Sequence, residues 1–180
     1  MSTSRGQRIG IWVIAVVMGV GTIGSFFVAI LANNNQQADQ KNAQDQYAKM
    51  LSEQRKSNKP LDGYKAEKFD KASIKELKVE TLKEGDGAVL TADSTIKANY
   101  FGWNANGEIF DTTNKDGTAT PIEFPLTGVI KGWTEGLTGV KVGSVVKLTI
   151  PADKAYGDID DGSGRPTGPL VFIVEVTELK

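Results

Sequence analysis

The nine residues VIKGWTEGL, at positions 129–137, place a tryptophan, Trp133, between two glycines and close behind the β-branched pair Val129 and Ile130. A segment of this kind can form the floor of an apolar pocket. The surrounding sequence supplies further aromatic residues and one carboxylate at separated positions, namely Tyr100, Phe110, Asp111, Tyr156 and Phe172. Together these residue types offer aromatic walls and a few hydrogen-bonding groups, which suits the binding of an apolar group.

The composition limits the chemistry that such a pocket could perform. The chain has no Cys and no His, which excludes a thiol nucleophile, an imidazole base, disulfides and the usual zinc ligands. Rotation about an X–Pro bond needs none of these, since its barrier of about 18–20 kcal/mol comes from the lost amide resonance. An apolar pocket that removes water from the carbonyl disfavours the polar planar amide and so lowers this barrier.

In order and spacing, these residues resemble the FKBP family of peptidyl-prolyl isomerases over about residues 78–179. The resemblance implies that Trp133 is the floor beneath the substrate proline and that Tyr100 and Phe110 are side walls. It also implies that Val129 and Ile130 line the entrance, where the Ile130 backbone N–H donates to a substrate carbonyl.

The same resemblance gives roles to the remaining candidates. Tyr156 is expected to donate its hydroxyl to the residue before the proline, Phe172 to close the inner wall, and Asp111 to hold polar neighbours at the rim. Ile122 stands where family members usually have a pocket aromatic, and is expected to contact substrate. The segment from Gly157, reading GDIDDGSGRPTGP, lacks the isoleucine-proline flap typical of the family, so substrate preference is not carried over.

The elements that must position these residues are short strands and one short helix. Alternation predicts strands over residues 77–82, 95–103, 122–124, 145–150 and 170–179, with Ile96, Ala98, Tyr100 and Gly102 on one face of the second. The dipeptide Asn106-Gly107 predicts a hairpin turn, and residues 111–117 a polar loop. Glycines at 132, 136 and 139 limit the helix to about residues 131–138. The predicted fold class is α+β, an antiparallel, strongly twisted sheet of about five strands around one short helix.

The N-terminus predicts a membrane anchor. Residues 9–32 are 24 consecutive uncharged, mostly apolar residues. As a helix at about 1.5 Å per residue they would reach about 36 Å, enough for a hydrocarbon core of about 30 Å. Arg5 and Arg8 precede this segment, so the positive-inside rule keeps residues 1–8 cytoplasmic and places the rest outside the cytoplasm. The alternative is a cleaved signal peptide and a secreted protein, which the length and the Ile30-Leu31-Ala32 exit fit less well.

Between the anchor and the strands, the chain is polar. Residues 33–73 are interpreted as a stalk and linker, with a solvated helix over about residues 37–55, and the FKBP-like domain as residues 74–180. Residues 72–180 carry eleven Lys and Arg against sixteen Asp and Glu, so phosphate would be repelled and no nucleic-acid partner is expected.

The sequence leaves more than one function open. The leading hypothesis is a monomeric, membrane-anchored isomerase acting on proline-containing polypeptides, without cofactor or metal. Asp158, Asp160 and Asp161 faintly resemble a calcium loop, but the 12-residue spacing and terminal Glu of such a loop are missing. The alternatives are a non-catalytic chaperone or peptide-binding module of the same fold, and a silent domain with a structural role.

Overall fold

The computed structural model describes residues 46, 49–50, 53, 57–160 and 164–180. The predicted transmembrane helix over residues 9–32 lies outside the described residues. Of the predicted stalk helix, residues 46, 49, 50 and 53 are described and are helical. Within the described ranges, no helix has the length and apolar character needed to cross a bilayer.

One compact unit of the chain comprises Asn58–Ile159 and Pro166–Lys180. Its elements, in chain order, are the 3-10 turn η1 (Lys71–Ser73), β1 (Lys78–Lys83), β2 (Thr95–Trp103), β3 (Ile109–Thr112), β4 (Asn114–Lys115), β5 (Thr118–Ala119), β6 (Ile122–Pro125), η2 (Leu126–Gly128), α3 (Lys131–Leu137), β7 (Val145–Ile150), η3 (Ala152–Lys154) and β8 (Leu170–Leu179). The structure therefore confirms the predicted arrangement of short strands with one short helix.

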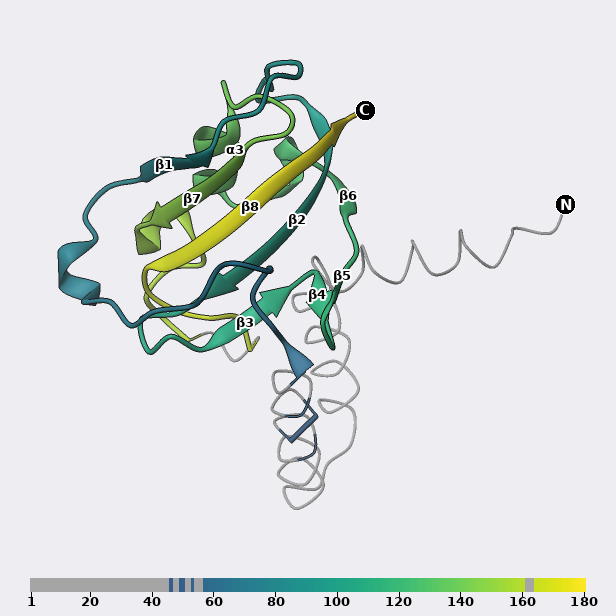
Figure 1. Ribbon diagram of the computed structural model, residues 1–180. Coiled ribbons are helices and arrows are strands. Elements are labelled where there is room, and N and C mark those ends of the chain that lie inside the picture. The colour runs from purple at the N-terminus through teal and green to yellow at the C-terminus, as the bar shows by residue number, and fades with distance from the viewer. Residues whose placement is uncertain (1–45, 47–48, 51–52, 54–56, 161–163) are drawn as a thin grey trace, which may run out of the picture. The chain divides into compact units, whose positions relative to one another are not determined.

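Six strands form one antiparallel sheet in the order β1-β7-β8-β2-β3, with β6 also paired to β2 (Figure 1). The strand β6 pairs with the first part of β2, from Thr95 to Ala98, while β3 pairs with its last part, from Phe101 to Trp103. The two strands thus share one edge. The sheet has six strands where the sequence predicted about five, because β3 was not among the predicted strands.

Residues 98–103 of β2 and residues 170–174 of β8 are buried on both faces, which in β8 explains the uninterrupted apolar run from Leu170 to Val174. Partners in an antiparallel register point to the same face, so Gly102 and Phe172 share one face and Phe101 and Ile173 the other. We call the face of Gly102 and Phe172 the helix face, because α3 packs there.

The glycines of α3 bring this helix close to the sheet. A Cβ on Gly132 would lie 2.4 Å from Ile150 Cγ2, and one on Gly136 would lie 2.9 Å from Leu148 Cδ2. Gly139 follows the helix with a φ of 89°, and its N–H donates to the Leu90 carbonyl at 2.9 Å. The helix therefore ends where the sequence predicted, and its internal glycines permit the close approach.

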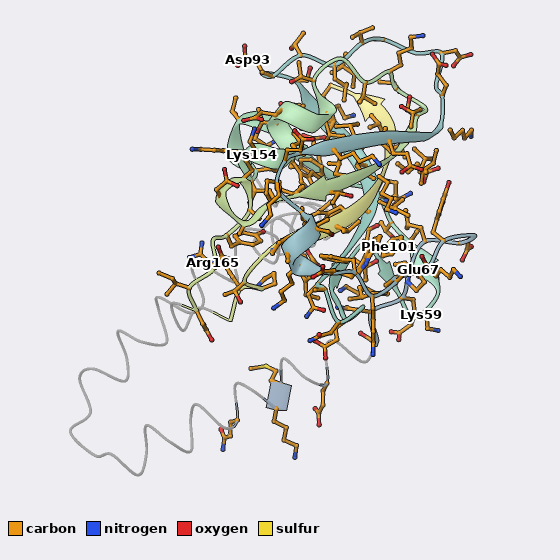
Figure 2. The ribbon with its side chains drawn as sticks, turned by 90° about the vertical axis from the view of Figure 1, so that its left-hand side faces the viewer. Lys59, Glu67, Asp93, Phe101, Lys154 and Arg165 are labelled. Atoms are coloured by element: carbon orange, nitrogen blue, oxygen red, sulfur yellow. The ribbon has the colours of Figure 1, made fainter. Side chains whose placement is uncertain are left out.

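The opposite face of the sheet is covered by residues 58–73, which the sequence interpretation assigned to the linker. Leu61 is buried there against Phe101, Trp103 and Ile173, with Tyr64, Ala66 and Phe69 packed beside it. The indole Nε1 of Trp103 donates to the Glu67 carbonyl at 2.9 Å, and the Trp103 ring stacks on that of Phe101 with centroids 5.1 Å apart; Glu67 and Phe101 are labelled in Figure 2. The globular unit thus begins at Asn58 rather than Ile74, because this face of the sheet is apolar and needs a cover.

The predicted polar loop over residues 111–117 also has more structure than expected. Asn114–Lys115 and Thr118–Ala119 form a two-stranded hairpin. The connecting Asp116 and Gly117 have φ values of 55° and 93°, as an Asp-Gly hairpin turn requires. Thr112, Thr113 and Asn114 are buried polar residues, so this segment is a hydrogen-bonded corner and not a solvated loop.

Candidate functional site

The helix face carries a cluster of aromatic rings centred on Trp133. This tryptophan lies in the first turn of α3 and is 5% exposed. The rings of Tyr100, Phe124 and Phe172 surround it edge-on, with centroids at 5.1, 5.3 and 5.3 Å from the centroid of Trp133. Phe110 extends the cluster, with its ring centroid 5.5 Å from that of Phe172. Edge-to-face contacts of this kind hold each ring in a fixed orientation.

Gly102 makes room for the outer part of this cluster. A Cβ at this position would lie 2.4 Å from Phe172 Cε1 and 2.8 Å from Phe110 Cζ. The two phenylalanine rings therefore lie over the bare backbone of β2. Tyr100, two residues earlier on the same face, brings its ring to Trp133. Because side chains alternate along β2, the Tyr100 ring and the space above Gly102 lie next to each other on the helix face.

The rim of the cluster is formed by half-buried residues. Val129 and Ile130 connect η2 to α3, and Phe110 lies on β3. The Ile130 carbonyl accepts from the Trp133 N–H at 2.9 Å, whereas the Ile130 N–H has no acceptor among the described residues. The amide is therefore available to a ligand carbonyl.

Ile122 lies on β6 opposite Ala98 and is half-buried. Because paired residues share a face, Ile122 is on the helix face, and so is Phe124, which is paired to Ile96. Phe124 packs on Trp133, and the sequence interpretation did not include it among the site residues. The alternation in Ile122-Glu123-Phe124 already indicated that both apolar side chains lie on the same face of the strand.

Asp111 is the carboxylate at the edge of the cluster. Its Oδ2 accepts from the Tyr100 hydroxyl at 2.6 Å and its Oδ1 from the Thr112 N–H at 2.9 Å. Burial raises the pKa of Asp111 above its usual range, while the bond from Tyr100, the attraction of Lys115 and the Thr112 N–H act to lower it. The carboxylate thus fixes the phenol that packs against Trp133.

The pKa of Tyr100 is raised well above its usual value, first by burial and then by the negative charge of Asp111 and the hydrogen bond to it. Tyr156, which is half-buried, adds a smaller effect in the same direction. Tyr100 therefore acts as a hydrogen-bond donor and remains neutral at physiological pH.

Tyr156 follows η3 in a tight turn, where the Gly157 N–H donates to the Ala152 carbonyl at 2.9 Å. The Gly168 N–H donates to the Gly157 carbonyl at 2.8 Å, which joins the two ends of the segment that begins at Asp158. The chain that departs after Gly157 thus returns to Gly157 at Gly168, next to Tyr156 in the sequence.

The structure therefore brings together five of the predicted site residues, namely Tyr100, Phe110, Asp111, Trp133 and Phe172. Within the part of the chain that the structure describes, there is no group of three or more His, Cys, Asp or Glu side chains placed to hold a metal ion. In the same part, the buried Trp133 Nε1 has no hydrogen-bond partner. The arrangement can enclose an apolar group, offer it an amide N–H at Ile130 and exclude water from it.

An antiparallel sheet around a short helix, with a tryptophan on that helix ringed by strand aromatics, defines a class of small α+β domains. Comparison with known proteins identifies the family. The sequence profile of the FKBP-type peptidyl-prolyl cis-trans isomerases matches residues 87–177. The chain belongs to this family.

Several curated relatives share this region. The chain is 38% identical over 104 residues to the FKBP-type 22 kDa peptidyl-prolyl cis-trans isomerase of Escherichia coli K12, covering 57% of this chain and 50% of the relative. It is 38% identical over 114 residues to FkpA of the same organism, covering 63% of this chain and 42% of the relative. The FK506-binding protein of Streptomyces anulatus is 39% identical over 106 residues, covering 56% and 84%. The chain thus spans about half the length of the E. coli relatives.

Among solved structures, a peptidyl-prolyl cis-trans isomerase of Pseudomonas syringae pv. tomato DC3000 superposes with a TM-score of 0.51 at 24% identity, covering 82% of this chain and 98% of that one. At this identity the similarity concerns the fold alone. It agrees with the antiparallel sheet and single short helix described above.

Proposed function

We propose that the globular unit is a peptidyl-prolyl cis-trans isomerase that binds X-Pro segments of polypeptides in the aromatic cluster. The observation that carries this proposal is the position of Trp133, ringed edge-on by Tyr100, Phe124 and Phe172 beside the unengaged Ile130 N–H. A proline ring seated on the indole would be held by apolar contact, while the Ile130 N–H would orient a neighbouring carbonyl.

The proposed rate enhancement comes from removing water. The planar ground-state amide is more polar than the twisted transition state, so a site that offers few polar groups destabilises the former more. Tyr156 would supply one hydroxyl toward the residue before the proline, and Asp111 would keep Tyr100 in place. No proton is transferred and no covalent intermediate forms, in keeping with a chain that has no Cys and no His.

The test is a prolyl-peptide isomerisation assay on the full chain in a non-denaturing detergent. The wild type is expected to accelerate isomerisation, and Trp133→Ala and Phe110→Ala to lose most of the acceleration. Trp103→Phe is the matched control, because Trp103 lies on the opposite face of the sheet. A wild-type protein that does not accelerate isomerisation above the uncatalysed rate would refute the enzyme hypothesis.

A second candidate, a non-catalytic peptide-binding module, is favoured by Ile122 in place of an aromatic and by the acidic segment after Gly157. It predicts that proline-containing peptides alter tryptophan fluorescence in the wild type but not in a Trp133→Phe variant, without turnover. Turnover that Tyr156→Phe weakens would exclude it.

We further propose that the protein is monomeric and anchored by residues 9–32, with residues 1–8 in the cytoplasm and the isomerase domain outside it. The support is the length of the apolar segment and the two arginines before it. A protein that stays with the membrane after carbonate extraction, and whose globular part is cleaved by protease added outside intact cells, would agree. A soluble mature form that begins near Asn33 would instead indicate a cleaved signal peptide.

A further inference from the structure

Residues 58–61, which we call the strap, run beside the corner formed by residues 111–115. Asn58 and Lys115 form an antiparallel bridge, and the Lys59 N–H donates to the Asn114 carbonyl at 3.2 Å. In return, Asn114 Nδ2 donates to the Pro60 carbonyl at 2.7 Å. Leu61, which is 6% exposed, anchors the end of the strap in the apolar cover of the sheet. The strap is thus fixed to the corner by backbone and side chain.

One route of hydrogen bonds leads from the strap to the Asp111 carboxylate through Thr112. The Thr112 hydroxyl lies 2.9 Å from the Lys59 carbonyl and 3.1 Å from the Tyr100 carbonyl, so it can donate to either, and it accepts from the Asn114 N–H at 2.9 Å. The backbone N–H of the same threonine donates to Asp111 Oδ1 at 2.9 Å. Thr112 is 3% exposed, so water cannot readily replace these partners.

A second route is electrostatic and passes through Lys115. Its ammonium donates to Asn58 Oδ1 at 2.6 Å, and Asn58 Nδ2 donates to the Ile109 carbonyl at 3.3 Å. Lys115 is half-buried, and its positive charge is attracted to Asp111 and Asp116. Asn58 therefore determines where this charge is held relative to the carboxylate.

We propose that the strap is a positioning element for Asp111, acting through the Thr112 hydroxyl and through the Asn58–Lys115 bond to fix the orientation and charge surroundings of this carboxylate. Asn58, Thr112 and Lys115 are then positioning residues, since none of them contacts an aromatic ring of the cluster in the contacts described above, and Thr112 meets Tyr100 only at its backbone carbonyl. The strap follows the predicted stalk directly in the sequence. The effect on turnover rests on the proposed isomerase function, whereas the effect on the carboxylate does not.

The first experiment compares Thr112→Val with Thr112→Ser in the full chain in detergent. Valine keeps the volume but loses the hydroxyl, and serine keeps the hydroxyl. We expect kcat/KM for a prolyl peptide to fall about tenfold in Thr112→Val and to stay within about twofold of wild type in Thr112→Ser, because small displacements at a reacting site are costly. Thermal unfolding is measured in parallel, and activity is compared well below the lower Tm.

A second readout separates positioning from general stability. The side-chain carboxyl carbons of Asp are observed by ¹³C NMR during a pH titration, with Asp111→Asn assigning the signal. Tyr100, Lys115 and the Thr112 N–H act directly on this carboxyl, Asp116 acts on Lys115, and Tyr156 acts on Tyr100. Lys115→Met is expected to move the Asp111 midpoint to higher pH, since it removes an attraction that lowers the pKa, and Lys115→Arg to restore it.

The role of Asn58 is tested by combining variants. Asn58→Ala is expected to move the Asp111 midpoint in the same direction as Lys115→Met, and the double variant no further than Lys115→Met alone. This non-additivity is expected because Asn58 acts through the lysine. Fully additive shifts would contradict this route.

The outcomes distinguish the two proposals. Equal activities of Thr112→Val and Thr112→Ser, or an Asp111 midpoint that Lys115→Met leaves unchanged, would overturn the positioning role. A wild type without isomerase activity whose Asp111 midpoint responds as expected would refute the proposed function and leave the positioning role standing. Where Thr112→Val does not fold, the Asn58 and Lys115 variants decide the question.

Discussion

Replacing Gly102 by alanine tests whether the aromatic cluster is the site of the reaction. The added Cβ would lie 2.4 and 2.5 Å from Phe172 Cε1 and Cδ1 and 2.8 Å from Phe110 Cζ, so both rings must move. Phe172 is 4% exposed and has little free space to move into. The variant therefore disturbs the cluster without removing any of its side chains.

The expected cost follows from two opposing effects. Overpacking in a core costs about 1–3 kcal/mol. Alanine recovers about 0.5–1 kcal/mol in a strand because glycine loses more backbone freedom on folding. With two rings displaced we expect a net loss of about 2 kcal/mol. For a compact unit of about 120 residues and an unfolding entropy of about 2.1 cal/mol/K per residue, this loss lowers Tm by about 8 °C.

The assay is prolyl-peptide isomerisation measured at least about 20 °C below the variant Tm, where the native state is fully populated. We expect kcat/KM of Gly102→Ala to fall about tenfold or more, since the ring positions define the site. Gly136→Ala is the matched control. Its Cβ would meet only the end of the Leu148 side chain at 2.9 Å and the Val79 Cγ2 at 3.4 Å, and alanine is favoured in a helix by about 1 kcal/mol.

The control is expected to keep activity close to that of the wild type and to lose less Tm than Gly102→Ala, because only the end of one side chain must shift and alanine is favoured in the helix. A folded Gly102→Ala protein with a lowered Tm and undiminished activity would refute the assignment of the reaction to this cluster. If Tm also stayed unchanged, the close packing of Phe110 and Phe172 over Gly102 would itself be wrong.

Three further predictions concern residues outside that contact. Burial raises the pKa of Asp111, so the folded chain binds a proton at this carboxyl more readily than the unfolded chain, and this group makes stability fall as pH rises from about 4 through the raised pKa. In urea unfolding at several pH values, the wild type should lose stability relative to Asp111→Asn over this range. A stability difference that stays constant with pH would contradict the prediction. Trp103→Phe should lower the unfolding free energy by about 1–2 kcal/mol, because the hydrogen bond to the Glu67 carbonyl is lost, and should leave kcat/KM unchanged. Trp133→Phe removes an N–H that lacks a partner within the described structure, so it should lower kcat/KM more than stability. Leu61→Ala should lower the unfolding free energy, measured by chemical denaturation, by about 2–4 kcal/mol. The control Leu82→Ala, at a site that is 38% exposed, should lower it by less than about 1 kcal/mol. Equal losses would show that residues 58–73 are not part of the core.

Much of the fold could be predicted because its elements are locally encoded. The bounds of β2, β7 and β8 follow from alternation and from β-branched residues, and the end of α3 follows from Gly139. The cover formed by residues 58–73 was assigned to the linker, because Leu61, Tyr64, Ala66 and Phe69 are separated by polar residues and follow no regular period. Their role appears only when the opposite face of the sheet is known to be apolar.

The hairpin over residues 114–119 was missed for a different reason. Its strands have two residues each, too short for alternation to be recognised, although Asp116-Gly117 is a strong turn signal. The burial of Thr112 to Asn114 was also unexpected, since Thr112 and Asn114 gain partners from the strap, more than 50 positions earlier, and Thr113 gains its partners from β2. Local composition carries no information about partners at that distance.

By itself the sequence determined the chemistry that this protein can offer. Without Cys and His, and with aromatic residues in a characteristic order, it indicated an apolar site and the strands that carry it. The tertiary structure decided which side chains meet: Phe124 joins Trp133 through the register of β6 with β2, and Phe110 and Phe172 meet over Gly102. It also decided that the strap bonds to Thr112 and Lys115. Contacts of this kind depend on strand register and on long-range packing, which no local pattern of residues specifies.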